Sequence, residues 1–249
     1  MNSRLVVLVL LVLIVFIAES KKLSNKVRMK CLQQHNKIRS KVAKGKCANG
    51  TSGSMLPKAG DMCQLSYSKK LEKKAIKIAK KCTWSQPVGT NVFVAAGKIK
   101  PAAALKNATK SWGNELNAPN VTFSLKYVAC GPGMNATGTG NFSQLIWAKT
   151  KEVGCAVQTC TNVTGSAING QATFVVCKYK AAGNVDQRII YKKSKKSGKK
   201  CPKGYKHAKK TGLCKKKPHK PRPSQPVVDC DCLCQLFLIP PSLCGDIFC

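Results

Sequence analysis

Fifteen cysteines in 249 residues constrain this chain more than any other feature of its sequence. Cysteines at this density are unusual in a cytosolic protein without metal clusters and common in secreted domains that are held by disulfides. Eight of them lie between residues 21 and 191, and seven lie beyond residue 200. The eight are Cys31, Cys47, Cys63, Cys82, Cys130, Cys155, Cys160 and Cys177. An even number permits four bridges there, while the odd total leaves one cysteine that is free or joins two chains.

The N-terminal residues also predict a secreted, extracellular protein. Arg4 precedes an unbroken apolar run over residues 5–18, and Ala18-Glu19-Ser20 follows the small-x-small pattern of a cleavage site. Such a run covers about 21 Å as a helix, which is too short for a bilayer core of about 30 Å. We therefore expect a signal peptide over residues 1–20. Six sequons for N-glycosylation agree with passage through the secretory pathway. They occur at Asn49, Asn107, Asn120, Asn135, Asn141 and Asn162.

The charge is strongly positive. Forty-four Lys and Arg stand against nine Asp and Glu, which leaves a net charge of +35. A chain of this composition does not fit a cytosolic enzyme, a polytopic membrane protein or an acidic disordered tail. It is typical of a protein that meets polyanions such as sulfated glycans or anionic cell surfaces.

Residues 21–191 read as one mixed α/β domain with a layered sandwich architecture. Helical periodicity predicts helices over residues 25–43 and 69–81 and from Pro101, and β-branched runs predict strands over residues 153–159 and 174–179. Ser24 or Asn25 caps the first helix, whose apolar stripe comprises Val27, Leu32, His35, Ile38 and Val42. The second helix presents seven lysines on its polar face against a single acid, Glu72.

Beyond Tyr191 the composition changes abruptly. Residues 192–222 contain fifteen basic residues and no acid, and Pro218, Pro221, Pro223 and Pro226 cluster at their C-terminal end, so we expect a Lys- and Pro-rich basic linker over residues 192–226. Residues 227–249 form a Cys-rich segment, where a soft-metal site at Cys230, Cys232 and Cys234 is less favoured than disulfides. The lysines predicted to bind polyanions are Lys192, Lys193, Lys195, Lys196, Lys199, Lys200, Lys215, Lys216 and Lys217.

Two sequence motifs carry a family resemblance. The run from Gly140 to Trp147 (GNFSQLIW), followed by VGCAV from Val153, resembles the first signature of the CAP superfamily. That superfamily includes the cysteine-rich secretory proteins, venom allergen 5 and pathogenesis-related protein 1. VVCKY from Val175 resembles its second signature, and the HNKIR run from His35 supports the match. The spacing around Met55 is similar to nematode venom-allergen-like and ancylostoma-secreted-protein-like members.

This resemblance implies a three-layer α-β-α sandwich and a disulfide between Cys155 and Cys177. It also implies a central cleft with two His and two Glu, which in some members holds a divalent metal. Three of these four positions differ here: Asn141 and Thr90 replace a His and a Glu, and the other His position falls near Ser85 and Gln86. Only Glu115 is retained.

The retained residues do not predict catalysis or metal binding. A zinc site needs three or four converging Cys, His or carboxylate ligands, and the domain has one histidine, His35, which fits a structural position on its helix. No Ser-His-Asp or Cys-His pair can be assembled, and no acid has an obvious carboxylate partner. We therefore expect no catalytic residue, no metal, no cofactor and no enzyme activity. A metal-dependent hydrolase would rest on Glu115 alone.

We expect a secreted, non-enzymatic protein that acts by binding, with a polycationic tail that holds it on glycosaminoglycans or anionic surfaces. Lysine suits delocalised attraction to sulfates better than bidentate recognition, so no specific nucleic acid is expected. One alternative is a carrier of sterol or fatty acid. Another is a venom-like effector that blocks a channel or a protein receptor, although the ten-cysteine module of the cysteine-rich secretory proteins is not reproduced. The odd cysteine permits a disulfide-linked dimer.

Overall fold

The computed structural model describes residues 22–218, apart from residues 51, 120, 122, 132, 133, 136 and 137. The side chains of residues 130, 131, 134 and 135 are not described either. The chain divides into two units between Lys216 and Lys217, and all of the described residues except Lys217 and Pro218 belong to the first unit. The predicted signal peptide, the Cys-rich segment over residues 227–249, the side chain of Cys130 and the sequon side chains of Asn120 and Asn135 lie outside the described residues.

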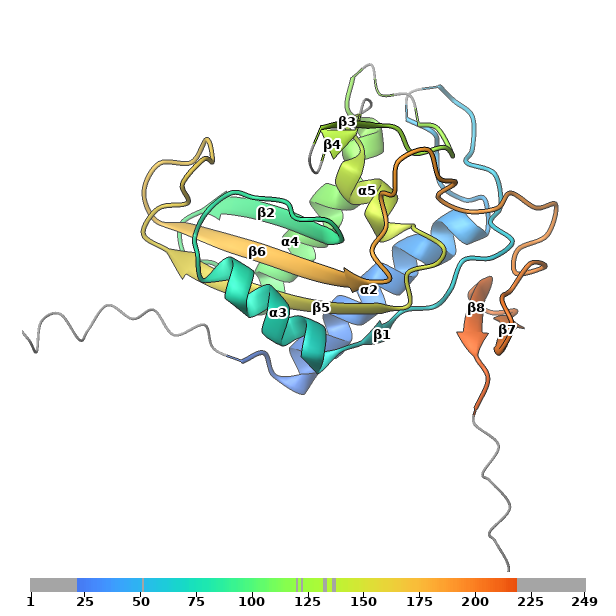
Figure 1. Cartoon of the computed structure of the whole chain (residues 1–249), viewed down its shortest axis with the longest axis horizontal. Coiled ribbons are helices and arrows are strands. Elements are labelled where there is room, and N and C mark those ends of the chain that lie inside the picture. The colour runs from blue at the N-terminus through green and yellow to red at the C-terminus, as the bar shows by residue number, and fades with distance from the viewer. Residues whose placement is uncertain are drawn as a thin grey trace, which may run out of the picture. The chain divides into compact units, whose positions relative to one another are not determined.

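A four-stranded sheet forms the middle layer of the first unit, in the order β1-β5-β6-β2 (Figure 1). Its strands are β1 (Ser66–Tyr67), β2 (Thr90–Ala96), β5 (Glu152–Cys160) and β6 (Ala172–Lys180). β5 and β2 both pair antiparallel with β6, whereas β1 runs parallel to β5. The two predicted strands are confirmed as β5 and β6, and β2 is an additional strand that local patterns did not predict.

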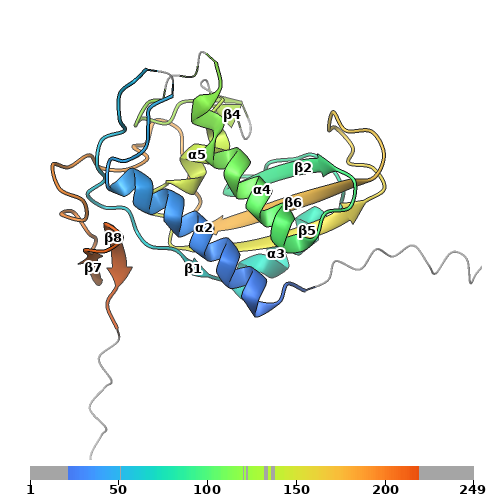
Figure 2. The same ribbon diagram turned by 180° about the vertical axis from the view of Figure 1, so that it is seen from behind.

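Helices cover both faces of this sheet. α3 (Lys69–Ala79) lies on one face, and α2 (Asn25–Ala43), α4 (Pro101–Gly113) and α5 (Gly140–Leu145) lie on the other (Figures 1 and 2). Along β6, Phe174 and Val176 join an apolar core beneath α3, while Val175 and Cys177 join a larger core beneath α2 and α4. This alternation produces one core on each face, which confirms the expected α-β-α sandwich.

The helix starts follow from their capping residues. The hydroxyl of Ser24 accepts a hydrogen bond from the backbone N–H of Val27, and that of Ser68 accepts one from Leu71. Each satisfies a donor that the first turn of a helix leaves free. Pro101 begins α4, where its fixed φ and missing N–H cost nothing. A 3₁₀ helix, η2 (Glu115–Asn117), continues from α4.

The buried face of α2 differs from the predicted stripe. Its buried residues are Cys31, His35, Arg39, Val42 and Ala43, whereas Val27, Leu32 and Ile38 are half-buried. Arg39 is inside because backbone carbonyls surround its guanidinium group, and Nε and the two terminal nitrogens donate to Cys63, Leu145 and Trp147. A fully hydrogen-bonded cation is tolerated in a core that excludes an unpaired one.

Residues 192–216 are folded onto the domain, so the expectation of a basic linker from residue 192 is wrong for this part of the chain. β7 (Tyr205–Ala208) and β8 (Leu213–Lys216) form a hairpin, and Leu213 and Cys214 are fully buried. The N–H of Cys214 donates to the carbonyl of Met62 (2.8 Å), and a disulfide joins Cys201 to Cys214. These backbone bonds and the disulfide fix the segment, which moves the domain boundary from residue 191 to residue 216.

Two further disulfides lie within the predicted domain. Cys155–Cys177 is the pair that the resemblance implied, and Cys82–Cys160 is the other. Cys31, Cys47 and Cys63 are free thiols, so the described part of residues 21–191 contains two of the four bridges that the even count permitted. The remaining short strands, β3 (Ala129–Gly131) and β4 (Met134–Asn135), pair with each other. Among the residues described, no helix is both long and apolar enough to cross a bilayer.

Candidate functional site

Glu115 lies at the start of η2, directly after α4, and faces the N-terminal end of α5. One carboxylate oxygen accepts a hydrogen bond from the side-chain amide of Asn141 (2.7 Å), and the other accepts one from the backbone N–H of Phe142 (2.7 Å). Both oxygens are therefore engaged by donors of the chain itself.

The other predicted cleft residues join the same network. The amide nitrogen of Gln86 donates to the side-chain oxygen of Asn141 (3.0 Å) and to the carbonyl of Thr90 (3.2 Å). The Thr90 hydroxyl turns away and donates to the carbonyl of Pro87. Asn91 of β2, which was not among the predicted cleft residues, donates to the Asn141 carbonyl (2.9 Å). Glu115, Asn141 and Gln86 thus meet through side chains, and Thr90 through its backbone.

Burial controls the acid–base behaviour of this network. It raises the pKa of Glu115 to about 7, although the hydrogen bonds from Phe142 and Asn141 favour the carboxylate. A carboxyl group with this pKa is able to exchange a proton near neutral pH. The groups that contact it are amides, however, so the network offers no nucleophile and no second acid or base.

This donor set does not fit a divalent metal ion. Zinc takes Cys, His or carboxylate ligands that converge at about 2.0–2.3 Å. Here one carboxylate meets amide N–H groups that point toward it, and the amide oxygen of Asn141 already accepts from Gln86. The side chains of Glu115, Asn141 and Gln86 form a hydrogen-bond network among themselves instead of a set of converging metal ligands.

His35 occupies a structural position in the core. Its ring nitrogens lie 2.9 Å from the carbonyl of Cys31 and 3.0 Å from the hydroxyl of Tyr179, and its ring packs edge-on against Trp112. Burial lowers its pKa to about 4, so the imidazole is neutral at physiological pH. The predicted structural role agrees with this geometry.

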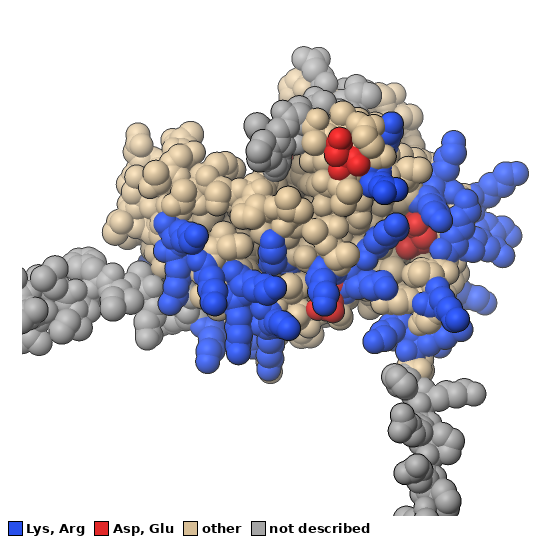
Figure 3. All heavy atoms as spheres, viewed as in Figure 1, with Lys and Arg blue, Asp and Glu red and all other residues tan. Residues whose placement is uncertain are grey.

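Lysines gather on two parts of the surface, over α3 and around β7 and β8 (Figure 3). Every lysine that the sequence predicted to bind polyanions is exposed: Lys192, Lys193, Lys195, Lys196, Lys199, Lys200, Lys215, Lys216 and Lys217. Of the sequons, Asn107 and Asn162 are exposed, whereas Asn49 is half-buried and Asn141 is used in the Glu115 network.

The profile of the cysteine-rich secretory protein family, CAP, matches residues 32–179, which include both signature motifs and the Glu115 network. The chain belongs to the CAP family. Its members are generally non-catalytic proteins of the venom-allergen or pathogenesis-related type.

Two curated relatives illustrate the similarity. Venom allergen 5 of Tityus serrulatus is 31% identical over 182 residues, which are 68% of this chain and 40% of the relative. Ancylostoma secreted protein of Ancylostoma caninum is 30% identical over 180 residues, which are 68% of this chain and 39% of the relative. The chain therefore matches about 40% of the length of these two CAP proteins.

A solved CAP structure supports the same assignment. The structure of NaASP2 with Zn2+ shares 32% sequence identity and superimposes with a TM-score of 0.65, over 79% of this chain and 99% of the other. The predicted similarity to ancylostoma-secreted-protein-like members is thereby confirmed.

Proposed function

We propose that this CAP protein acts outside the cell by binding and not by catalysis, and that its lysines hold it on sulfated glycans. One observation carries the proposal. The folded segment 192–216 exposes twelve lysines and contains no acid. Because the disulfide Cys201–Cys214 and the hairpin β7–β8 fix this segment, the charges are presented on a rigid surface, and binding does not have to order a flexible chain.

Helix α3 supplies a second cationic surface. Its single acid, Glu72, is buried and forms an ion pair with Arg28 (2.6 Å) while it accepts a hydrogen bond from Tyr67 (2.6 Å). Burial alone would raise the pKa of Glu72, but the hydrogen bonds from Arg28 and Tyr67 lower it. The carboxylate is therefore charged and turned inward, and its ion pair is with Arg28 and not with an exposed lysine of the helix. The exposed lysines are Lys69, Lys70, Lys73, Lys74, Lys77, Lys80 and Lys81.

This arrangement is unfavourable for the helix alone. Like charges four residues apart, such as Lys69 and Lys73, destabilise a helix by about 0.2–0.5 kcal/mol per pair. Lys69 and Lys70 also lie in the first turn, where the helix dipole disfavours cations. On the neighbouring strand, burial and the charge of Lys74 lower the pKa of Lys178. A bound polyanion would relieve the repulsion along the helix, the unfavourable dipole interaction and the repulsion between Lys74 and Lys178.

Sulfated glycans fit these surfaces better than nucleic acid does. Ammonium groups act as point charges that attract sulfate without the bidentate geometry of arginine. Base recognition needs arginine forks or stacked aromatic rings, and the segment 192–216 has no arginine and one aromatic residue, Tyr205. Relatives named as a venom allergen and a secreted protein support an extracellular setting, where such glycans occur.

The test is the salt concentration that elutes the full chain from immobilised heparin. Truncation at Tyr191 would remove the buried Leu213 and Cys214 and expose the core residues that they cover. Substitutions that remove only the lysine charges therefore give the better test. The triple variant Lys195→Gln, Lys196→Gln, Lys199→Gln removes three charges from the folded segment. We expect it to elute at clearly lower salt than the wild type, because counterion release scales with the number of contacts.

A matched control separates a defined surface from total charge. Lys106 and Lys110 are exposed on α4, which lies on the opposite face of the sheet from α3 (Figure 2), and Lys98 is exposed just before that helix. Their replacement by Gln removes the same charge and should lower the elution salt much less. Equal shifts for the two triple variants would contradict a defined binding surface, and no shift for either would contradict the proposal as a whole.

Two alternatives remain predictions without a supporting contact in the described residues. A carrier of sterol or fatty acid would yield lipid in extracts of the purified protein when these are examined by mass spectrometry. A channel- or receptor-blocking effector would bind a protein partner in a manner that heparin and salt do not abolish.

A further inference from the structure

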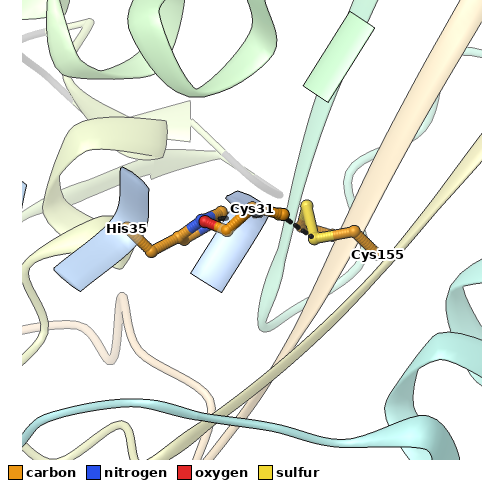
Figure 4. A group of neighbouring side chains, drawn as sticks. Cys31, His35 and Cys155 are labelled. Atoms are coloured by element: carbon orange, nitrogen blue, oxygen red, sulfur yellow. Dashed lines mark hydrogen bonds between the residues drawn. A yellow bond between two sulfur atoms is a disulfide. The ribbon is translucent and has the colours of Figure 1, made fainter. Parts of the chain in front are cut away.

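Three sulfur atoms from three elements meet in the core between α2 and the sheet. Cys155 of β5 lies opposite Cys177 of β6 in the strand register, and the two form a disulfide. The free thiol of Cys31, on α2, lies 3.6 Å from the sulfur of Cys155 (Figure 4). All three residues are almost completely buried.

The same group includes His35, and the four side chains are of the type that binds soft metals. Two of the sulfurs, however, are bonded to each other. The ring nitrogens of His35 are both within hydrogen-bonding distance of Cys31 O and Tyr179 OH. In this oxidised state the group has one thiol free to bind a metal, which is too few for a metal centre.

We infer that Cys31, Cys155 and Cys177 form an internal thiol–disulfide exchange site with two covalent isomers. The sulfur of Cys31, once deprotonated, attacks the sulfur of Cys155 and forms the new S–S bond. The bond between Cys155 and Cys177 breaks, and its electron pair leaves on the sulfur of Cys177. That sulfur takes up a proton to replace the one that Cys31 lost, so the reaction needs no oxidant or reductant.

The surroundings of Cys31 make this exchange slow at neutral pH. Burial, and next the charge of Glu72, raise the pKa of the thiol to about 12. The other titratable groups that face it are His35 on its own helix, Tyr67 of β1 and Tyr179 of β6. None of them supplies a positive charge, because His35 is neutral and burial raises the pKa of both tyrosines. The attacking thiolate is therefore scarce, and its population increases about tenfold with each pH unit.

The two isomers restrain the fold differently. The bond present joins neighbouring strands across 22 residues of sequence, whereas a bond between Cys31 and Cys155 would span 124. The longer loop restricts the unfolded chain more strongly, and it would tie the helical layer of α2 to the sheet. Exchange thus offers the protein a cross-layer bond in place of a bond within the sheet.

The experiment follows the position of the free thiol in the full-length protein. Samples are incubated under native conditions between about pH 7 and about pH 9, quenched with acid, unfolded, alkylated and mapped by mass spectrometry. We expect the alkylated cysteine to change from Cys31 to Cys177 as the incubation lengthens, at a rate that increases about tenfold for each pH unit. The rate should not depend on protein concentration, since the step is intramolecular. Cys82–Cys160 should stay intact throughout.

Two variants complete the test. Cys31→Ala removes the attacking thiol, so Cys177 should remain unlabelled. Cys47→Ala removes another free thiol that lies outside this group and should leave the exchange unchanged. Label that remains on Cys31 in folded wild-type protein after long incubation at the highest pH would overturn the inference. Labelling of Cys177 that depends on protein concentration would overturn it as well, and this measurement needs no variant to fold.

Discussion

At the scale of single residues, Glu115 shows how burial and hydrogen bonding compete. Its pKa of about 7 lies above its ordinary value of 4.5, so folding favours the protonated form. The corresponding stability is fully present below about pH 4.5 and is lost as the pH rises through about 7. Among the described cleft residues, this is the one group that titrates near neutral pH.

We predict that Glu115→Gln removes this pH dependence. Glutamine has nearly the same shape and stays neutral, so the wild type should lose about 3 kcal/mol of unfolding free energy relative to the variant between pH 4 and pH 8. Urea unfolding of both proteins across this range measures the difference. Parallel stability curves for the two proteins would contradict the raised pKa.

Arg39 provides a second prediction at this scale. Its guanidinium group donates to carbonyls on two separate segments, at Cys63 and at Leu145 and Trp147. A lysine has one nitrogen and cannot reach both, so Arg39→Lys leaves buried acceptors unpaired and should cost at least about 3 kcal/mol. Arg188→Lys, the same change at an exposed position, should stay within about 0.5 kcal/mol. Denaturant midpoints compare the two variants.

At the scale of elements, the contact between α3 and β5 positions the lysine-bearing helix. A Cβ atom on Gly154 of β5 would lie 2.2 Å from the backbone nitrogen of Glu72 and 2.5 Å from the carbonyl oxygen of Ser68. The first turn of α3 therefore rests directly on the strand, with no side chain between them. This close approach requires glycine at residue 154.

We predict that Gly154→Ala destabilises the protein by about 2–3 kcal/mol or more, because backbone atoms cannot yield as a side chain does. Gly113→Ala is a suitable control. Its nearest neighbour is the end of the flexible Ile38 side chain at 3.0 Å, and alanine favours the helix. Thermal unfolding should separate the two variants clearly. Similar midpoints would show that α3 can move away from β5 at little cost.

At the scale of the whole molecule, the segment 192–216 joins a basic surface to the sandwich. It is held by β-hairpin pairing, by backbone bonds to residues near Met62 and by the disulfide Cys201–Cys214. The carbonyls of Thr211 and Lys210 also accept hydrogen bonds from Ser40 and Lys44 at the end of α2. The lysines are thus attached to the rigid core through several independent contacts.

We predict that replacing Cys201 and Cys214 together by alanine releases this segment locally. The bridge spans 13 residues, and closing a loop of this size contributes about 3 kcal/mol in the chain-entropy description. Trypsin should then cleave after Lys203, Lys206 or Lys209 much faster than in the wild type, while the sandwich stays folded. Unchanged proteolysis would mean that the backbone contacts alone hold the hairpin.

Much of the fold was predictable from local patterns. Serine caps, helical spacing and β-branched runs predicted α2, α3, α4, β5 and β6, because each depends on residues close together in the chain. The family motifs identified Glu115, Asn141, Gln86 and Thr90 as one group, and the structure brings them together. β2 was missed because Thr90–Ala96 lacks a strong alternating pattern and is recognised only by its pairing with β6.

The sequence by itself determined the CAP sandwich, the amide and hydroxyl side chains at Asn141, Gln86 and Thr90, and the excess of lysine. Only the tertiary structure decided where three groups belong: Arg39 lies in the core, Glu72 turns inward, and residues 192–216 fold onto the domain. Each outcome depends on atoms far away in the chain, such as Arg28, which lies 44 residues from Glu72. Local composition favours solvent for an arginine, a glutamate or a run of lysines. For Arg39 and Glu72, partners supplied by distant segments reverse that preference, because they replace the hydrogen bonds that water would otherwise provide. The lysines of residues 192–216 stay exposed, and the segment is held by the buried Leu213 and Cys214.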